Sequence, residues 1–261
     1  MRHSKHKFIL SLALLFSSIG FTTNAQISII AHRGASAYET ENSLAAFKKA
    51  FKLKADAIEM DIWRTTDDSL VIMHDRTTGR TTNGNLVVPE STAADLRALR
   101  LNNGEQIPFV SEVISLVPKR KKMVIEIKNF KEKGNAGTVF PMLSNQLKQS
   151  GRAKDAIIIS FGAEVLAEAK KHLPECKCYY LSGKENAEEE LIETCKKLKL
   201  DGLNVHYKIL TESLAEKTKR AGLDLLVWTV DDPEVVKHAR GKVIGITTNK
   251  PDVVRKYIHH D

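Results

Sequence analysis

The feature that most constrains the fold is a regular alternation of short apolar segments with segments of helical periodicity. Eight segments are rich in β-branched and other apolar residues: 27–32, 57–63, 123–128, 156–161, 177–181, 202–206, 225–230 and 243–247. Between them apolar residues recur at spacings of three and four, as at Leu44, Phe47 and Phe51. This alternation is typical of parallel strands connected by helices. Eight such units predict an α/β fold of the (β/α)8 barrel type. An open doubly wound sheet is less favoured, because no glycine-rich phosphate loop follows the first segment.

One further short strand interrupts the alternation. Residues 70–74 follow the second segment across only Thr66-Asp67-Asp68-Ser69, whereas a parallel return needs about a dozen residues or more. We therefore expect 70–74 to run back antiparallel along 57–63. A turn centred on Asp67 and Asp68 would place Asp61 opposite His74 and on the same face as Glu59. The residues after this hairpin, 75–108, carry turn signals and are expected to form an insertion.

The first 25 residues have the pattern of a secretory signal. Arg2, Lys5 and Lys7 precede an uncharged apolar run over 8–21, and Thr23-Asn24-Ala25 supplies small residues for cleavage after Ala25. The run is shorter than the about 20 apolar residues of a spanning helix, and no cysteine near the cleavage point could carry a lipid. We expect an exported protein, periplasmic or secreted, with no stable membrane anchor and a mature domain over 26–261.

The remaining composition argues against several partner classes. The chain of 261 residues is 42% hydrophobic and 28% charged, which is typical of a globular domain. Removal of the signal lowers the net charge from +8 to +5, and the lysine-rich clusters are not interleaved with aromatic residues, so we expect no nucleic-acid partner. Cys176, Cys178 and Cys195 lack metal or redox spacing and are interpreted as packing residues, with a bridge from Cys195 left open. Nothing in the sequence specifies an oligomeric state.

Ionisable residues gather where the first three barrel segments and the hairpin end. In a (β/α)8 barrel these ends form the active face. Two carboxylates within the apolar segment 57–63 also require cations nearby, because burial of an unpaired charge is costly. The candidates are His32, Arg33, Glu59, Asp61, His74, Glu126 and Lys128, and the later strand ends add Phe161 and Trp228.

These residue types suit metal-assisted phosphoryl transfer. Glu59, Asp61 and Glu126 offer hard oxygen ligands for one divalent cation, Ca²⁺ or Mg²⁺, and the absence of a thiolate cluster makes zinc less favoured. Arg33 and Lys128 could hold a phosphate group. Two histidines with pKa values near neutrality could serve as base and acid.

Short motifs in the same order and spacing resemble those of the glycerophosphodiester phosphodiesterases over nearly the whole mature chain. They are His32-Arg33-Gly34, Glu41-Asn42, Glu59-x-Asp61, Thr66-x-Asp68, His74-Asp75, Arg80-Thr81-Thr82-x-Gly84, Ile107-Pro108, Glu126-x-Lys128, Ser160-Phe161, Gly202-x-Asn204, Val227-Trp228-Thr229-Val230 and Ile246-Thr247-Thr248-x-x-Pro251. The chain departs from the family pattern at Asp68-Ser69, where Asp-Gly is usual, at Phe109-Val110, where Thr-Leu is usual, and at Asn249, where the family often has Asp.

The resemblance implies the same barrel and the hydrolysis of a glycerophosphodiester to sn-glycerol 3-phosphate and an alcohol. It implies His32 and His74 as the catalytic pair and a pocket lined by Phe161 and Trp228. The family's metal ligands fall on Glu59, Asp61 and Glu126, and its phosphate-contacting residues on Arg33 and Lys128. Attack by the glycerol 2-hydroxyl through a cyclic phosphate and direct attack by water both fit these residues.

Three alternatives use the same scaffold. A phosphodiesterase or phospholipase acting on intact phospholipid or phosphoinositide would share the two histidines and the metal, but no strongly apolar loop is seen at the strand ends. A glycosidase using Glu59 and Glu126 would leave both histidines without a role. A binding protein would be expected to have lost one of the seven candidate residues, and all are present.

Overall fold

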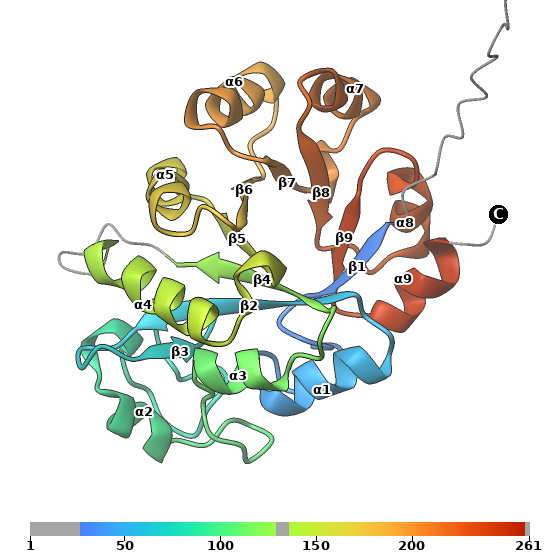
Figure 1. Cartoon of the computed structure of the whole chain (residues 1–261). Helices are drawn as coiled ribbons and strands as arrows, with labels where there is room; N and C mark the ends of the chain where they lie inside the picture. The colour runs from blue at the N-terminus through green and yellow to red at the C-terminus, as the bar shows by residue number, and fades with distance from the viewer. Residues whose placement is uncertain (1–26, 129–135, 259–261) are drawn as a thin grey trace, which may run out of the picture.

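The computed structural model describes residues 27–128 and 136–258, so the expected signal segment lies outside the described residues. Eight parallel strands of the described chain close into a barrel, in the order β1, β9, β8, β7, β6, β5, β4, β2 and back to β1 (Figure 1). Their bounds are β1 (Ser28–Ala31), β2 (Ala57–Arg64), β4 (Lys122–Ile127), β5 (Ala156–Ser160), β6 (Lys177–Ser182), β7 (Gly202–His206), β8 (Asp224–Trp228) and β9 (Gly245–Thr248). The predicted (β/α)8 barrel is confirmed.

Most of the helices lie on the outside of this ring, and one lies in the insertion after the hairpin (Figure 1). They are α1 (Leu44–Lys52), α2 (Ala93–Ala98), α3 (Val110–Leu116), α4 (Ala136–Gln149), α5 (Ala163–His172), α6 (Glu188–Leu198), α7 (Glu212–Arg220), α8 (Pro233–Ala239) and α9 (Pro251–Ile258), with 3-10 turns η1 (Val88–Glu90), η2 (Ala153–Asp155) and η3 (Tyr207–Ile209). Several begin at side-chain caps: the side chains of Ser43, Thr211 and Asp232 accept backbone N–H bonds at the starts of α1, α7 and α8.

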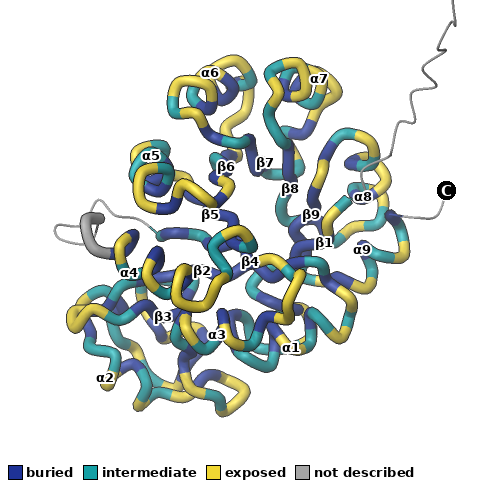
Figure 2. Tube along the Cα trace, in the orientation of Figure 1, coloured by how far each residue is buried: buried dark blue, intermediate teal, exposed yellow. Residues whose placement is uncertain are grey.

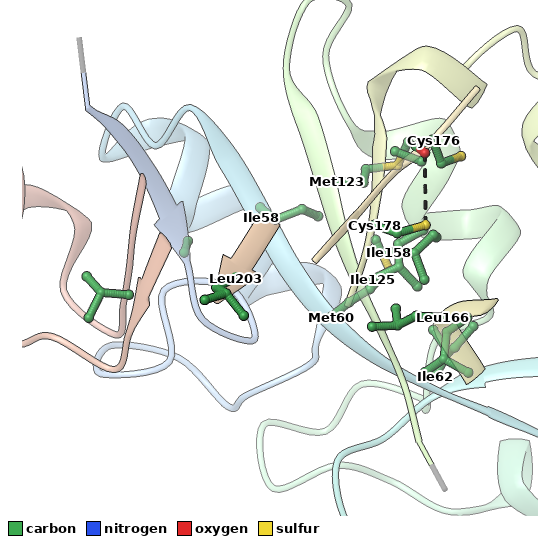
Figure 3. Packing of buried hydrophobic residues seen from close by; sticks show 14 of the residues in the cluster. Ile58, Met60, Ile62, Met123, Ile125, Ile158, Leu166, Cys176, Cys178 and Leu203 are labelled. Carbon is green, nitrogen blue, oxygen red and sulfur yellow. Dashed lines mark hydrogen bonds between the residues drawn. The ribbon is translucent and has the colours of Figure 1, made fainter. Parts of the chain in front are cut away.

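The core has two layers, which follow from the alternation of side chains along each strand. Outward-facing residues such as Met60 and Ile125 pack with the inner faces of the helices, and Figure 3 shows part of this cluster. Inward-facing residues such as Ile30, Ala57 and Leu226 fill the barrel. The strands are accordingly buried while the outer faces of the helices are exposed (Figure 2).

The three cysteines belong to this packing. Cys176, Cys178 and Cys195 are buried free thiols, and Figure 3 shows Cys178 beside the carbonyl of Cys176. Burial raises the pKa of Cys176 to about 11 and those of Cys178 and Cys195 to about 12. Such thiols remain protonated and act as small apolar side chains.

The hairpin strand β3 (Leu70–Ile72) pairs antiparallel with β2, but the register differs by one residue from the prediction. Ile62 pairs with Ile72, and the backbone N–H of Met73 donates to the carbonyl of Asp61. Met73, not His74, therefore lies opposite Asp61.

The cause of this shift is the turn. The backbone N–H of Thr65 donates to the carbonyl of Ser69 at 2.9 Å, which leaves a three-residue loop at 66–68 instead of a turn centred between Asp67 and Asp68. Asp68 has φ of 60°, the left-handed conformation that closes such loops. His74 still reaches the barrel mouth, because regular pairing has ended before it.

Residues 75–108 build a cap beside the hairpin, containing η1 and α2. Trp63, Val71, Val88, Leu96 and Ile107 form a small cluster of buried residues between hairpin and cap. A capping box between Thr92 and Asp95 starts α2. This packing fixes the chain that follows His74.

Candidate active site

The turn after β1 brings the backbone of Arg33 against β2. Gly34 has φ of 82°, and a Cβ at this position would lie 2.6 Å from the backbone of Ala46 in α1, so the turn requires glycine. The tight turn directs the Arg33 backbone N–H at Glu59, whose Oε2 accepts it at 2.8 Å. The first strand end is thus anchored to the second.

Three carboxylates meet at the mouth of the barrel. Glu59 and Asp61 are two residues apart on β2 and face inward, and Asp61 is the direct register partner of Glu126 on β4. One oxygen from each of the three lies within 4.8 Å of the others. Glu59 and Asp61 are 2% and 1% exposed. The predicted ligands are therefore brought together, with Glu59 and Asp61 buried and Glu126 partly buried.

Burial and mutual repulsion set the charges of this carboxylate cluster, Glu59, Asp61 and Glu126. Burial, with the charges of Asp61 and Glu126, raises the pKa of Glu59 well above its usual range. Burial and Asp61 likewise raise the pKa of Glu126 to about 7. Burial also opposes ionisation of Asp61, but Lys128 and Arg33 hold the pKa of Asp61 below its usual value. Full ionisation of the three carboxyl groups is therefore unfavourable in the protein alone, and a bound cation would lower its cost.

The two predicted basic residues lie beside Asp61. Lys128 Nζ is 2.7 Å from Asp61 Oδ1 and 2.5 Å from Glu126 Oε1. Arg33 Nε is 3.5 Å from Asp61 Oδ2, which also accepts a hydrogen bond from Asn42 Nδ2 at 2.8 Å. Positive charge therefore lies next to the carboxylate cluster, where it could also contact an anionic ligand.

His74 is held by a chain of charged side chains that starts at the next residue. His74 Nδ1 is 2.7 Å from Asp75 Oδ1, and Arg80 Nε donates to Asp75 Oδ2 at 2.5 Å. The Arg80 guanidinium also makes two hydrogen bonds to Glu41, which accepts a third from Arg33. This series of hydrogen bonds links His74 to Arg33 in the turn after β1.

His32 is held from the opposite side by residues after β8 and β9. Its Nδ1 lies 2.8 Å from Asn249 Oδ1, and Asn249 Nδ2 donates to Asp231 Oδ2 at 2.6 Å. Burial and the neighbouring Arg33 charge lower the pKa of His32 to about 4. Burial also lowers the pKa of His74, although Asp61 opposes the shift. The His32 imidazole is therefore neutral at pH 7.

The aromatic candidates lie at the rim. Phe161 is 53% exposed and makes an edge-on contact with Trp228, with ring centroids 5.6 Å apart. Trp228 Nε1 donates to the carbonyl of Asn204, and its ring also contacts His206. A cleft of about 660 Å³ is lined by His74, Glu126, Lys128 and Phe161 among others, while His32 and Trp228 do not line it.

Several supporting residues were missed as site residues from the sequence: Glu41, Asn42, Asp75, Arg80, Asp231 and Asn249. The first four stand in the motifs that carry the family resemblance, and Asn249 is a departure from the family pattern. Asp231 carried no local signal. Its position is set by the contact between the β8–α8 loop and the end of β9.

Comparison with known proteins gives a consistent result. A model of the glycerophosphoryl diester phosphodiesterase family matches residues 32–253. A glycerophosphodiester phosphodiesterase of Caldanaerobacter subterraneus is 33% identical over 244 residues, covering 87% of this chain and 95% of the relative. The crystal structure of a glycerophosphodiester phosphodiesterase from Parabacteroides distasonis has a TM-score of 0.79 and 27% identity, covering 90% of this chain and 98% of that one.

A phosphodiesterase of Oleispira antarctica, solved in complex with the product sn-glycerol-3-phosphate, shares the fold. Its TM-score is 0.81 and its identity 23%, with 89% of this chain and 97% of that chain covered. Within the described residues, no helix combines the length and the hydropathy needed to cross a membrane.

Proposed function

This chain belongs to the glycerophosphoryl diester phosphodiesterase family, and we propose that it hydrolyses glycerophosphodiesters to sn-glycerol 3-phosphate and an alcohol. The observation that carries the proposal is the close group of Glu59, Asp61 and Glu126, two of them fully buried, with Lys128 and Arg33 beside it. Hard oxygen ligands next to two basic groups suit a cation and a phosphate diester bound together.

The carboxylate cluster fits one divalent cation. Its donors are all carboxylate oxygens, which Mg²⁺ and Ca²⁺ prefer, and the raised pKa values of Glu59 and Glu126 record burial and mutual repulsion, whose cost a cation would offset. Glu59, Asp61 and Glu126 would hold the ion. When bound, the ion supplies electrostatic stabilisation of the charge that develops on the phosphoryl oxygens.

The chain's own residues supply the proton transfers. One imidazole of the pair His32 and His74 takes the proton of the attacking hydroxyl, from the glycerol 2-position or from water, as the new O–P bond forms. The other imidazole donates its proton to the alcohol oxygen as the old O–P bond breaks. Attack by the 2-hydroxyl gives a cyclic phosphate, which water then opens. Arg33 and Lys128 orient the phosphate and offset its charge.

We expect Ca²⁺ or Mg²⁺ to raise the melting temperature more at pH 8 than at pH 5.5. Glu59 and Glu126 have raised pKa values in the folded protein. Between about pH 4.5 and 7 the metal-free folded protein therefore keeps protons on these two groups, whereas the unfolded chain has already released them. The stability of the metal-free protein therefore declines as the pH rises through this window, and binding of a cation must displace those protons at low pH. Thermal unfolding with EDTA or with millimolar cation measures the difference. Equal shifts at both pH values would contradict this account of the cluster.

Substrate class is tested with a panel of diesters. Purified mature protein would be assayed for sn-glycerol 3-phosphate release from glycerophosphocholine, glycerophosphoethanolamine and glycerophosphoinositol. In parallel, phosphatidylcholine and phosphatidylinositol vesicles would be assayed for release of the water-soluble head group or its phosphate. Release from the soluble diesters alone supports the proposal. Hydrolysis of the vesicles alone would favour the phospholipase alternative, which shares the two histidines and the cation.

We also propose that the chain is exported and cleaved after Ala25, on the pattern of its first 25 residues. N-terminal sequencing of protein recovered outside the cytoplasm would show Gln26 as the first residue. Recovery of the full-length chain from the cytoplasm would contradict this proposal.

A further inference from the structure

Asp231, in the loop after β8, is a hydrogen-bond acceptor for the end of β9. Its Oδ1 accepts from Thr248 Oγ1 and from the Asn249 backbone N–H, both at 2.8 Å. Its Oδ2 accepts from the Asn249 side-chain amide at 2.6 Å. Three bonds to one carboxylate fix the Asn249 side chain in place.

These bonds determine which way the Asn249 amide faces. A carboxylate has no proton to give, so the atom of Asn249 that contacts Asp231 must be the NH₂ group. The amide oxygen then faces His32 Nδ1 at 2.8 Å and Ser36 Oγ at 2.7 Å. An amide oxygen only accepts, so His32 must carry its proton on Nδ1 and a lone pair on Nε2. In the described part of the chain Nε2 has no hydrogen-bond partner.

We propose that Asn249, oriented by Asp231, is a positioning residue that holds His32 as the Nδ1–H tautomer, with Nε2 as the acceptor of the proton from the attacking hydroxyl. This inference rests on the proposed function. His74 differs because its Nδ1 faces the Asp75 carboxylate, which stabilises an imidazolium. The geometry thus makes His32 the base and His74 the acid.

A neutral partner suits a base because it stabilises the protonated ring less than a carboxylate would. Burial and Arg33 favour neutral His32, while Asp61, Glu41 and the bond to Asn249 favour the charged form, and neutrality prevails. The charge of Asp231 lies behind the Asn249 amide. A carboxylate in direct contact with Nδ1 would raise the pKa of His32 by about one unit or more.

The test exchanges the two side chains. In the double variant Asp231→Asn/Asn249→Asp, the new amide at 231 donates to the new carboxylate at 249 and its oxygen still accepts from residues 248 and 249. All hydrogen bonds can remain, but a negative charge now lies at His32. At saturating cation, we expect the acidic limb of the pH profile of kcat/KM to move about one pH unit or more towards alkaline pH. The plateau value of kcat/KM should stay within about tenfold of wild type.

Asn249→Ala should lower the plateau value of kcat/KM by about 10- to 100-fold. Asp252→Asn, an exposed change on α9, is the control and should match wild type.

The tautomer is measured independently of turnover. In nitrogen-15 NMR spectra of the histidine side chains of the mature protein, the resonance that is missing from the spectrum of His32→Gln is assigned to His32. We expect the Nδ1–H pattern in wild type and a raised His32 pKa in the exchanged variant. An Nε2–H pattern in wild type, or an acidic limb and a His32 pKa that do not move in the exchanged variant, would overturn the proposal. A wild-type protein without hydrolysis but with the Nδ1–H pattern would instead count against the proposed function alone.

Discussion

Glu59→Gln is expected to stabilise the metal-free protein while lowering kcat about a thousandfold. Glu59 is fully buried and its pKa is raised by burial and by the charges of Asp61 and Glu126, so removal of its charge relieves repulsion at neutral pH. The glutamine oxygen can still accept the Arg33 backbone N–H. The loss of an anionic ligand should remove several kcal/mol of electrostatic stabilisation from the transition state.

Two readouts separate these effects. Thermal unfolding in EDTA at pH 8 should give a melting temperature about 3 °C or more above wild type, and added Ca²⁺ or Mg²⁺ should no longer raise it. Glu216→Gln, an exposed change on α7, should leave both quantities unchanged. A Glu59→Gln protein that is destabilised, or that still gains stability from the cation, would show that the carboxylate cluster is a structural ion-pair network.

His74→Gln is expected to lower kcat for glycerophosphocholine by about 10²–10⁴-fold and to regain much of that loss with a p-nitrophenyl glycerophosphodiester. A p-nitrophenolate leaves without a proton, so the acid is no longer needed. His32→Gln should lose activity with both substrates, because the attacking hydroxyl still needs a base. The cation should raise the melting temperature of both variants as in wild type.

The comparison of the two substrates assigns the histidines. Recovery in His32→Gln instead of His74→Gln would reverse the acid and base roles inferred from Asn249 and Asp75. Equal recovery or equal loss in both variants would contradict a division of labour between the two imidazoles. Steady-state kinetics at saturating cation suffices for either result.

The barrel and the principal site residues could be predicted because they depend on local patterns. Each strand has an apolar segment of its own, and alternation along 57–63 places Glu59 and Asp61 on one face whatever the neighbouring strands are. The ends of parallel strands meet at one face of a barrel, so His32 and Glu126 could be expected near each other.

The hairpin register and the side chains that support the two histidines depend on details that short sequence patterns do not encode. The hairpin register followed from Asp68 accepting a left-handed conformation usually taken by glycine, which lengthened the loop by one residue. The support of His32 by Asp231 and of His74 by Arg80 joins loops distant in sequence. Nothing in the residue types alone selects those partners among the many charged residues of the loops.

The central claim is that a cation held by Glu59, Asp61 and Glu126 acts with two histidines on a glycerophosphodiester. The most direct measurement is the release of sn-glycerol 3-phosphate from glycerophosphocholine by the mature protein, before EDTA, after EDTA, and after EDTA with Ca²⁺ or Mg²⁺ restored. The account predicts release that EDTA abolishes and that the cation restores, and a rate in Glu59→Gln that stays about a thousandfold below wild type after the cation is restored. Release that persists in EDTA, or release by Glu59→Gln at the wild-type rate, would contradict it.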